Sequence, residues 1–420
     1  MIKRRLTAKV LDHLSKKEIS LIVGPRQAGK TTLMLFIKDY LDQRGEKTLF
    51  LNFDIESDRE FFESQEKLLR KIRLELGTGR GYVFLDEIQR KEDAGIFLKG
   101  LYDMNLPYKF IASGSGSAEL KEKIHESLAG RKRIFELGAI SFDEFVDFKT
   151  GYKYEKKLAD FFKIEKKKTD SLLLEFLNFG GYPRVVLEER EEEKFEAIRE
   201  IYQSYLEKDI ALLLGIKKSD DFTRLVKIMA SQIGSLLNVS ELSATLGISV
   251  PTIKNYLWYL EKTYIIKRAT PYYKNVRKEI TKAPVYYFCD LGLRNYASGD
   301  FGKVNLEGNA GFLFENFVFN LLKEGVAGKM VSVNFWRTTD GAEVDFVIDD
   351  GKKPIPVEAK FKRMKEAKIT RSLRSFLEKY KPLEALVVNL SFSGEMRIKN
   401  SRVKFIRYTE LMGNLRCLIG

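Results

Sequence analysis

The chain has 420 residues, which is too many for one ordinary hydrophobic core, so we expect two to four domains. Hydrophobic residues make up 44% of it, yet no apolar run approaches the roughly 18 residues that a membrane span needs, and no signal peptide is expected. Cys289 and Cys417 are too few for a disulfide framework, which favours a reducing cytoplasm. Scarce glutamine and histidine beside abundant lysine and glutamate favour a thermophilic source.

The net charge of +14 is unevenly distributed along the chain. Residues 1–220 hold 41 basic and 39 acidic side chains, a net charge of +2, whereas residues 221–420 hold 32 and 20, a net charge of +12. A basic back half joined to a nearly neutral front half indicates a polyanionic partner, and we expect that partner to be nucleic acid. The alternative is a surface that is charged only for solubility.

Five apolar runs in the first third of the chain are typical of strands, and helical patterns separate most of them. This alternation predicts a parallel sheet covered by helices, and therefore an α/β fold. The expected strands are Glu18–Val23, Thr48–Asp54, Gly81–Asp86, Lys109–Ser113 and Arg133–Leu137.

The first expected strand leads into GPRQAGKTT, which fits the phosphate-binding pattern G-x-x-x-x-G-K-T. Its glycines let backbone N–H groups surround phosphates, and the following helix offers its positive end. We expect Lys30 to reach the β- and γ-phosphates of ATP and Thr31 to hold Mg²⁺. The predicted nucleotide-binding residues are Gly24, Pro25, Arg26, Gln27, Ala28, Gly29, Lys30, Thr31 and Thr32, joined by Asp86.

The ends of the third and fourth expected strands carry polar residues suited to ATP hydrolysis. Asp86 falls at the tip of the third strand, where a second acid completes a magnesium shell. Glu87 follows directly, and we predict that it polarises the attacking water as a general base. The fourth strand ends in Ser113-Gly114-Ser115. ATPases of the extended AAA type carry at this place a polar residue that senses the γ-phosphate, and this resemblance implies Ser113, or else Ser115, in that role.

Arg131 lies in LAGRKRIFEL, just before the fifth expected strand. Related ring ATPases carry at this place the arginine that reaches a neighbouring subunit's nucleotide, where it stabilises transition-state charge. A basic surface loop is the alternative, because Lys132 and Arg133 follow it directly. Arg131 in this role predicts a homo-oligomer, with a hexameric ring as one arrangement.

In this order, GPRQAGKTT, FLDEIQR, ASGSGS, LAGR, SFDEF and GGYP resemble the archaeal and bacterial AAA-type ATPases with a C-terminal DUF4143 region. The resemblance covers nearly the whole chain. It implies a P-loop core (residues 1–140), a helical lid (141–220), a winged helix (221–285) and a restriction-endonuclease-like domain (286–420). Within the lid we expect KKTD, residues 167–170, to form a surface turn and Arg184 of GGYPR to act as a second nucleotide sensor.

Residues 238–275 have helix–turn–helix form. Gly247 allows the tight turn, Ser249 can cap the second helix, and Pro251 fits its first turn. Leu242, Leu246, Ile248, Ile253, Leu257 and Leu260 are spaced to face a core. The expected DNA-binding residues are Thr252, Lys254 and Asn255, with Tyr259 beside them, on the exposed face of the second helix and Tyr273, Lys274 and Arg277 in a basic wing.

Phosphate contacts would dominate such binding, so we expect DNA to be held with low sequence specificity. Winged helices also serve as protein-interaction modules, but the positive charge of residues 221–420 favours DNA as the partner of this one.

The stretch DFVIDDGKKPIPVEAK, residues 345–360, predicts a charged hairpin that turns at Asp350-Gly351-Lys352-Lys353. With Asp349 opposite Pro354, Asp345 lies directly across from Glu358, and Lys360 shares a strand face with Glu358. Two carboxylates and an ammonium then converge on one point. Asp345 and Glu358 would bind a divalent metal, and Lys360 would stabilise the attacking water or the phosphate charge.

The preceding segment, Gly311–Leu322, is expected to be a helix whose Phe312, Phe319 and Leu322 face the core. Restriction-type nucleases often carry a glutamate on this helix, which makes Glu315 a further metal ligand by resemblance. Many members of that fold retain only DNA binding, so cleavage and binding both stay open.

The leading functional hypothesis is an ATP-driven oligomer that binds and remodels DNA, branched or forked, with or without cleavage. The alternatives are a regulatory switch, in which ATP controls a DNA- or protein-binding module, and a nuclease whose ATPase only gates cutting. Glu87 favours continuous turnover, because a pure switch has less need of a catalytic base.

Overall fold

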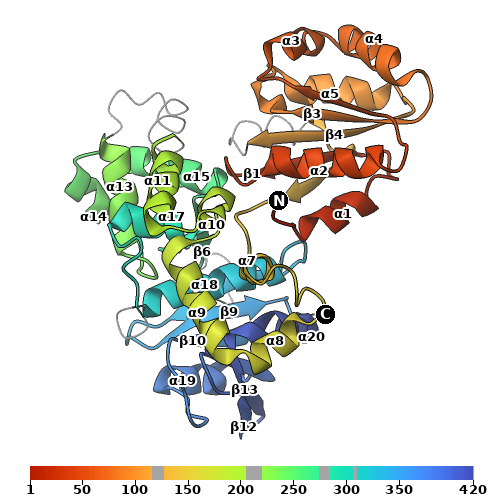
Figure 1. The fold of residues 1–420 in the computed structure, drawn as a ribbon. Coiled ribbons are helices and arrows are strands. Elements are labelled where there is room, and N and C mark those ends of the chain that lie inside the picture. Colours follow the sequence, from red (N-terminus) through yellow and green to blue (C-terminus); the bar gives the residue numbers. More distant parts are fainter. Residues whose placement is uncertain (116–126, 205–219, 274–282, 306–309, 420) are drawn as a thin grey trace. The chain divides into compact units, whose positions relative to one another are not determined.

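The computed structural model describes residues 1–115, 127–204, 220–273, 283–305 and 310–419. The chain divides into two compact units (Figure 1). Unit 1 comprises Met1–Lys149, Gly181–Glu188 and Leu257–Ile265, and unit 2 comprises Thr150–Gly180, Glu189–Tyr256 and Ile266–Gly420. Within the described ranges, no helix is both long and apolar enough to cross a membrane.

Unit 1 is built around a five-stranded parallel sheet of order β2-β3-β4-β1-β5. The five predicted strands all lie in this sheet, so the α/β prediction is confirmed. Its strands are β1 (Ile19–Gly24), β2 (Thr48–Asn52), β3 (Gly81–Asp86), β4 (Tyr108–Ser115) and β5 (Lys132–Glu136). Its α-helices are α1 (Leu6–Asp12), α2 (Lys30–Asp42), α3 (Glu56–Arg59), α4 (Gln65–Leu76), α5 (Ala94–Asp103), α7 (Phe142–Lys149) and α10 (Pro183–Leu187).

Two apolar clusters cover the two faces of this sheet. One contains Ile19, Leu21 and Val23 of β1 with residues of α4 and α5, and the other contains Ile22 with residues of α1 and α2. Strands β1 and β3 are buried along their whole length, as expected for central parallel strands. The sheet is therefore rigid, and the carboxyl ends of its strands are fixed relative to one another.

Unit 2 contains a six-stranded mixed sheet of order β12-β13-β11-β10-β9-β8. Its strands are β8 (Ser332–Arg337), β9 (Glu343–Asp349), β10 (Ile355–Lys360), β11 (Glu384–Asn389), β12 (Gly394–Ile398) and β13 (Ser401–Arg407). Helix α19 (Arg371–Tyr380) buries Leu373, Phe376 and Leu377 against residues of β8, β9, β11 and β13. Helices α18 (Gly311–Gly325) and α20 (Leu411–Ile419) pack on each other, and α18 also contacts β10.

Among the residues that the structure describes, the other elements of unit 2 are helices and one strand pair. The helices are α8 (Leu158–Ile164), α9 (Lys166–Phe179), α11 (Glu191–Tyr202), α13 (Asp220–Ser231), α14 (Val239–Leu246) and α17 (Leu291–Ser298). Helix α15 (Val250–Lys262) begins in unit 2, and its last turns belong to unit 1. Strands β6 (Ile266–Ala269) and β7 (Val285–Phe288) form an antiparallel pair, and segment 270–272 continues onto β8 through backbone bonds with Phe335.

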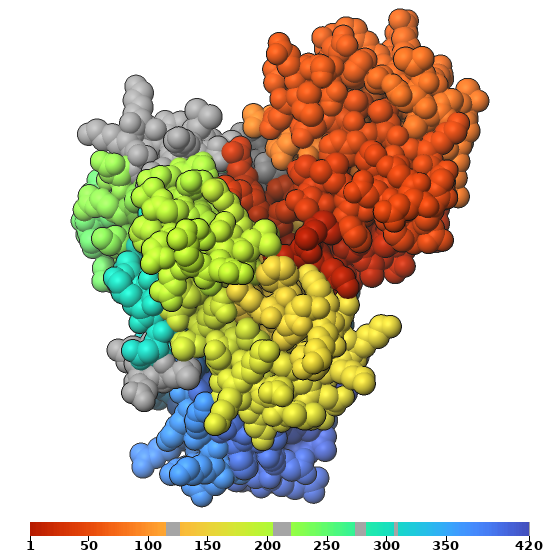
Figure 2. Space-filling view, viewed as in Figure 1, coloured from red at the N-terminus to blue at the C-terminus, as the bar shows by residue number. Residues whose placement is uncertain are grey.

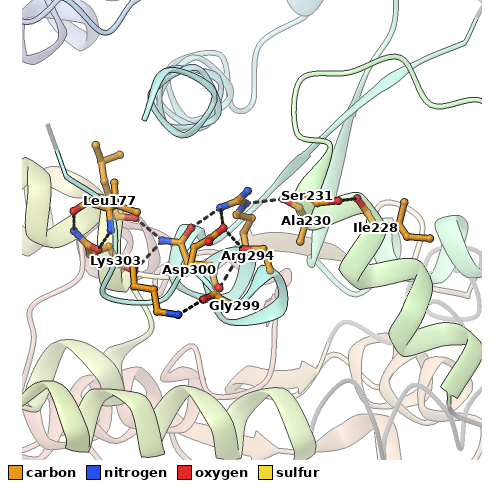
Figure 3. Close-up of polar contacts among 12 residues, drawn as sticks. Leu177, Ile228, Ala230, Ser231, Arg294, Gly299, Asp300 and Lys303 are labelled. Carbon is orange, nitrogen blue, oxygen red and sulfur yellow. Dashed lines mark hydrogen bonds and ion pairs between the residues drawn. The ribbon is translucent and has the colours of Figure 1, made fainter. Parts of the chain in front are cut away.

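Helix α17 joins other helices of unit 2 through polar side chains (Figure 3). Arg294 donates from Nε to the carbonyl oxygen of Ala230 at 2.7 Å and pairs with Asp300 at 3.2 Å. Asn295 donates to the carbonyl oxygens of Leu177 and Asn178, at 2.8 and 2.9 Å. The end of α13 and the end of α9 are therefore both fixed to α17.

The structure corrects two sequence predictions. KKTD is not a surface turn but part of helix α9, in which Thr169 and Asp170 are buried. Arg363 pairs with Asp170 at 2.6 Å, so a tertiary contact overrides the polar local sequence. In Figure 2 the atoms of residues 150–180 accordingly lie against the blue C-terminal atoms. Phe312, expected in the core, is 58% exposed on α18, whereas Phe319 and Leu322 are buried as predicted.

Candidate functional site

The phosphate-binding loop of unit 1 runs from the end of β1 to the start of α2. Gly24 has no room for a side chain, because a Cβ atom would lie 2.0 Å from the carbonyl oxygen of Leu137. Gly29 caps α2 with a left-handed φ of 90°, which favours glycine. The Lys30 ammonium is buried and donates to the carbonyl oxygens of Gly24 and Pro25, at 3.2 and 2.9 Å. Burial lowers the pKa of Lys30 to about 8.

Asp86 organises the polar residues beside this loop. Its carboxylate is fully buried and accepts hydrogen bonds from Thr31 at 2.7 Å, from Asn52 at 3.3 Å and from Ser113. The structure therefore brings Thr31, Asp86 and Ser113 together at the carboxyl ends of the strands. Asn52, at the end of β2, was not predicted as a site residue; its place near the carboxyl end of the expected strand Thr48–Asp54 was the available signal. Ser115 pairs with Gly24 between β4 and β1.

Glu87 follows Asp86 in an unusual backbone conformation. Its φ of 55° lies in the left-handed region, which is rare for a residue other than glycine and often marks a functional position. The Glu87 amide donates to the Ser113 hydroxyl at 3.4 Å, and Gln89 donates to the Glu87 carboxylate. The short helix Ile88–Arg90 is tied to the end of β2 by an ion pair between Arg90 and Asp54 at 2.5 Å. The carboxylate of Glu87 is thus oriented by its neighbours.

Arg131 lies at the other edge of the sheet. It precedes β5, and its carbonyl oxygen accepts from the amide of Ile19 at the start of β1. Its guanidinium pairs with Asp103 at 2.8 Å, and the side chain is 33% exposed. The phosphate-binding loop lies at the carboxyl ends of the same strands, so Arg131 lies at the opposite end of the sheet from this loop.

Arg4 is a functional candidate that the sequence analysis missed. Its side chain is only 9% exposed and donates to Ala28 of the phosphate-binding loop at 2.9 Å. It also donates to the carbonyl oxygens of Gly138 and Ala139, at 2.8 and 3.1 Å, and pairs with Glu144 at 3.2 Å. Glu144, in the SFDEF motif, further accepts from the amides of Arg5 and Ser141.

The GGYP motif borders the same loop. The amide of Ile140 donates to the carbonyl oxygen of Gly181 at 2.7 Å. A Cβ atom built on Gly29 would lie 3.9 Å from Pro183. Arg184 is exposed on α10 immediately after Pro183. Its predicted role as a second sensor stays a prediction.

The predicted DNA-binding residues lie on α15 and after β6. Ser249 accepts from the amide of Thr252 at 3.3 Å and so caps α15 as expected. Lys254 and Asn255 are exposed, whereas Thr252 and Tyr259 are half-buried, as is Tyr273 after β6. Ile253, Leu257 and Leu260 are buried, which confirms the predicted apolar face. Lys274 and Arg277 lie outside the described residues.

The hairpin of β9 and β10 has the predicted register. Val357 pairs with Phe346 and Ile355 with Ile348, so Asp345 lies opposite Glu358. Lys360 stands between the two acids, with its Nζ 4.0 Å from Asp345 and 3.5 Å from Glu358. The amide of Ala359 donates to Asp345 at 2.7 Å. The convergence of two carboxylates and one ammonium is therefore confirmed.

Glu315 of α18 is half-buried and accepts a hydrogen bond from Tyr287 at 2.6 Å. Burial, assisted by the charge of Asp345, raises the pKa of Glu315 well above its usual range. Burial likewise raises the pKa of Asp345, although Lys360 opposes this. In the described ranges, however, no three His, Cys, Asp or Glu residues are arranged to hold one metal ion. Only Asp345 and Glu358 flank the lysine.

Together, the sheet order and the phosphate-binding loop define a P-loop domain of the AAA class. Residues 16–146 match the AAA domain family, and residues 310–411 match a domain of unknown function, DUF4143. A further family, the domain of unknown function DUF8612, matches residues 170–303 and was not anticipated from the sequence. The chain thus combines an AAA domain with a C-terminal DUF4143 region, as its motifs predicted.

Several relatives resemble this chain over most of its length. The uncharacterized protein Rv2008c of Mycobacterium tuberculosis is 28% identical over 383 residues, which cover 90% of this chain and 78% of the relative. An uncharacterized protein of Haemophilus influenzae is 27% identical, covering 87% and 88% of the two chains. MJ1544 of Methanocaldococcus jannaschii, also uncharacterized, is 26% identical, covering 91% and 84%.

Solved structures with a detectable likeness include the replication initiator DnaA bound to AMPPCP and single-stranded DNA. It is 16% identical, with a TM-score of 0.28, and the match covers 62% of this chain and 90% of that one. A structure of katanin self-assembly gives 16% identity and a TM-score of 0.26, covering 34% and 54%.

Proposed function

We propose that this protein is an Mg²⁺-dependent ATPase that assembles into an oligomer and uses ATP turnover to remodel DNA. The observation that carries the ATPase part is the contact between Thr31 and Asp86 at the start of α2, 2.7 Å apart. A hydroxyl and a carboxylate beside a phosphate-binding loop fit Mg²⁺, which is bound by few protein ligands together with substrate phosphates. Thr31 and Asp86 would hold the ion, which would supply compensation for phosphate charge.

The roles of the other residues follow from their positions. Lys30, now bonded to Gly24 and Pro25, exchanges these carbonyl oxygens for phosphate oxygens when ATP binds. Glu87, held by Gln89, accepts a proton from the attacking water. Ser113 connects the Asp86 carboxylate to the Glu87 amide, and so links the magnesium side of the site to the general base.

The oligomer is inferred from Arg131, which lies at the sheet edge away from its own phosphate-binding loop. An arginine supplied by a neighbouring subunit stabilises transition-state charge. Before it reaches a neighbour, the guanidinium has to leave Asp103, and this ion pair is exposed enough to exchange cheaply. Contact between subunits is therefore coupled to hydrolysis.

DNA is the proposed partner of the back half. The net charge of +12 on residues 221–420 and the exposed Lys254 and Asn255 on α15 support a winged helix that grips phosphates. Such contacts carry little sequence information, so binding is expected to depend on DNA form more than on sequence.

Steady-state ATPase assays of the full chain with single-stranded, duplex, forked and four-way DNA test this function. DNA should raise kcat several-fold, most for the structure on which the protein acts, because remodelling couples hydrolysis to DNA contact. An ATPase rate that ignores every DNA form, in a protein that nevertheless binds ATP and DNA, would favour the regulatory switch. Absence of DNA binding at low salt would remove DNA from the proposal.

The convergence of Asp345, Glu358 and Lys360 favours a second candidate activity, divalent-metal-dependent cleavage of DNA. The two carboxylates would hold the metal ion, which supplies Lewis-acid activation when bound. Lys360, at 3.5–4.0 Å from both acids, would stabilise charge on the phosphate under attack.

Replacement of Asp345 by Asn should abolish Mg²⁺-dependent cleavage while DNA affinity persists, because the substitution removes a negative charge and leaves the cations in place. Supercoiled-plasmid nicking and a filter-binding measurement give the two readouts. The matched control is Asp349→Asn, which removes an acid from the same strand at the far end of the hairpin. Wild-type protein that never nicks DNA with Mg²⁺ or Mn²⁺ would refute the cleavage candidate and leave the ATPase proposal intact.

A further inference from the structure

A strip of exposed cations begins two residues after Lys360. Residues 361–375 contain six basic side chains and a single acid, Glu366. Arg363 is held by Asp170 at 2.6 Å. We name the other five the basic strip: Lys362, Lys365, Lys368, Arg371 and Arg374, all exposed. None of the five makes a side-chain ion pair with any residue that the structure describes.

The backbone beneath the basic strip is fixed. The carbonyl oxygen of Lys362 accepts from the amides of Met364 and Leu390, at 3.1 and 3.2 Å, and the hydroxyl of Ser391 donates to Met364 at 2.9 Å. Arg371 and Arg374, about one helical turn apart on α19, are both exposed, whereas Leu373, Phe376 and Leu377 of the same helix are buried. Like charges held this close repel one another, and a polyanion relieves the repulsion.

The basic strip also adjoins the acids of the hairpin. Thr370 caps α19, accepting from the amide of Leu373 at 3.0 Å, and donates to Glu358 at 2.5 Å. The basic strip therefore begins just after Lys360, and the start of α19, which carries Arg371, lies beside Glu358. A chain of phosphates bound along the strip would therefore come close to Lys360 and Glu358.

We propose that the basic strip is a binding track for the phosphodiester backbone of a nucleic acid, separate from the helix–turn–helix segment. Arginine forms paired hydrogen bonds with phosphate oxygens and lysine supplies a point charge, so the track recognises backbone and not base sequence. The inference rests on the proposed DNA partner and adds a second, independent contact, one that sets which phosphodiester lies at the hairpin acids.

The salt dependence of DNA affinity tests the track in the full chain. The track variant is Lys365→Gln, Lys368→Gln and Arg371→Gln together. The control variant, Lys9→Gln, Lys16→Gln and Lys99→Gln, removes the same charge from exposed lysines of unit 1. Fluorescence anisotropy with a labelled duplex, from about 50 to 200 mM salt, gives the slope of log affinity against log salt.

Each lost phosphate contact lowers the magnitude of this slope by about 0.9, so the track variant should lose up to about 2.7. The control should keep the wild-type slope, and both should keep wild-type ATPase rates without DNA. Equal slopes in the track variant and wild type would overturn the inference while the proposed DNA partner stands. An equal loss of slope in the track and control variants would show that DNA affinity follows the overall charge of the protein, which would also overturn the inference. The inference would also be overturned if the wild-type protein binds no DNA. It would be overturned as well if the protein binds polyglutamate through these residues as tightly as it binds DNA.

Discussion

Replacement of Glu87 by Gln should lower the kcat for ATP hydrolysis by about 10²- to 10⁴-fold, the usual contribution of a general base. The amide keeps the shape of the side chain and its contact with Gln89, but it cannot accept the proton of the attacking water. ATP affinity should not fall, because no hydrogen bond joins Glu87 to the described residues of the phosphate-binding loop, and removal of its negative charge beside Lys30 does not weaken phosphate binding. Steady-state kinetics together with equilibrium binding of a fluorescent ATP analogue separate the two effects.

Lys30→Ala supplies the contrast, because the variant loses the ammonium that compensates phosphate charge and should bind ATP weakly. Glu92→Gln is the matched control: this glutamate is exposed five residues further along and should be silent in both assays. Near-normal turnover by Glu87→Gln would remove Glu87 from the catalytic role and leave the base unassigned.

The same assay examines Arg131. Arg131→Ala alone should hydrolyse ATP slowly, yet mixing it with Lys30→Ala should restore part of the rate at mixed interfaces. In those interfaces an intact Arg131 from one subunit meets an intact Lys30 from the other. If Arg131→Ala alone hydrolyses ATP at the normal rate, Arg131 has no role in hydrolysis and serves only in its exposed ion pair with Asp103.

Much of unit 1 could be predicted because its signals are local. Apolar runs of strand length, followed by GPRQAGKTT and FLDE, place the phosphate-binding loop and Asp86 at strand ends without knowledge of packing. The hairpin register of Asp345 and Glu358 was equally accessible, since the turn residues fix which strand positions face each other. In each case, short-range geometry determines which side chains meet.

The failures come from contacts between distant parts of the sequence. KKTD has the composition of a turn, but it lies in helix α9, where Asp170 accepts a hydrogen bond from Arg363, 193 residues further along the chain. The burial of Glu315 beneath Tyr287 depends on how β7 packs against α18, which no local pattern reports. Arg4 belongs to the same class, because its partner Glu144 lies 140 residues away.

Arg4→Ala is the second change for which we expect a large effect. Removing one partner of a buried, hydrogen-bonded ion pair costs about 3–5 kcal/mol of stability, because the remaining charge is left without compensation. The substitution also frees the carbonyl oxygens of Ala28, Gly138 and Ala139. The phosphate-binding loop then loses the hydrogen bonds through which Arg4 connects it to the segment after β5. The KM for ATP should therefore rise, and the protein should unfold at a lower urea concentration.

Arg5→Ala is the matched control, one residue away. Arg5 pairs with Asp143 at 2.8 Å, but its side chain is 42% exposed, and such surface pairs contribute about 0.2–1 kcal/mol. Urea unfolding of both variants, with ATP kinetics measured in parallel, therefore compares a buried arginine with an exposed one in the same segment. Equal, small effects of the two substitutions would contradict the role assigned to Arg4.

A double-mutant cycle with Glu144→Gln separates the ion pair from the contact with the loop. Glu144 also accepts from the amides of Arg5 and Ser141, at 2.6 and 3.0 Å, so a glutamine retains part of its bonding and costs less than the loss of Arg4. The coupling energy between the two substitutions should fall within about 0.5–3 kcal/mol, as for residues in one hydrogen-bond network. The rise in the KM for ATP should follow Arg4→Ala and not Glu144→Gln, because Arg4 alone of this pair bonds to Ala28.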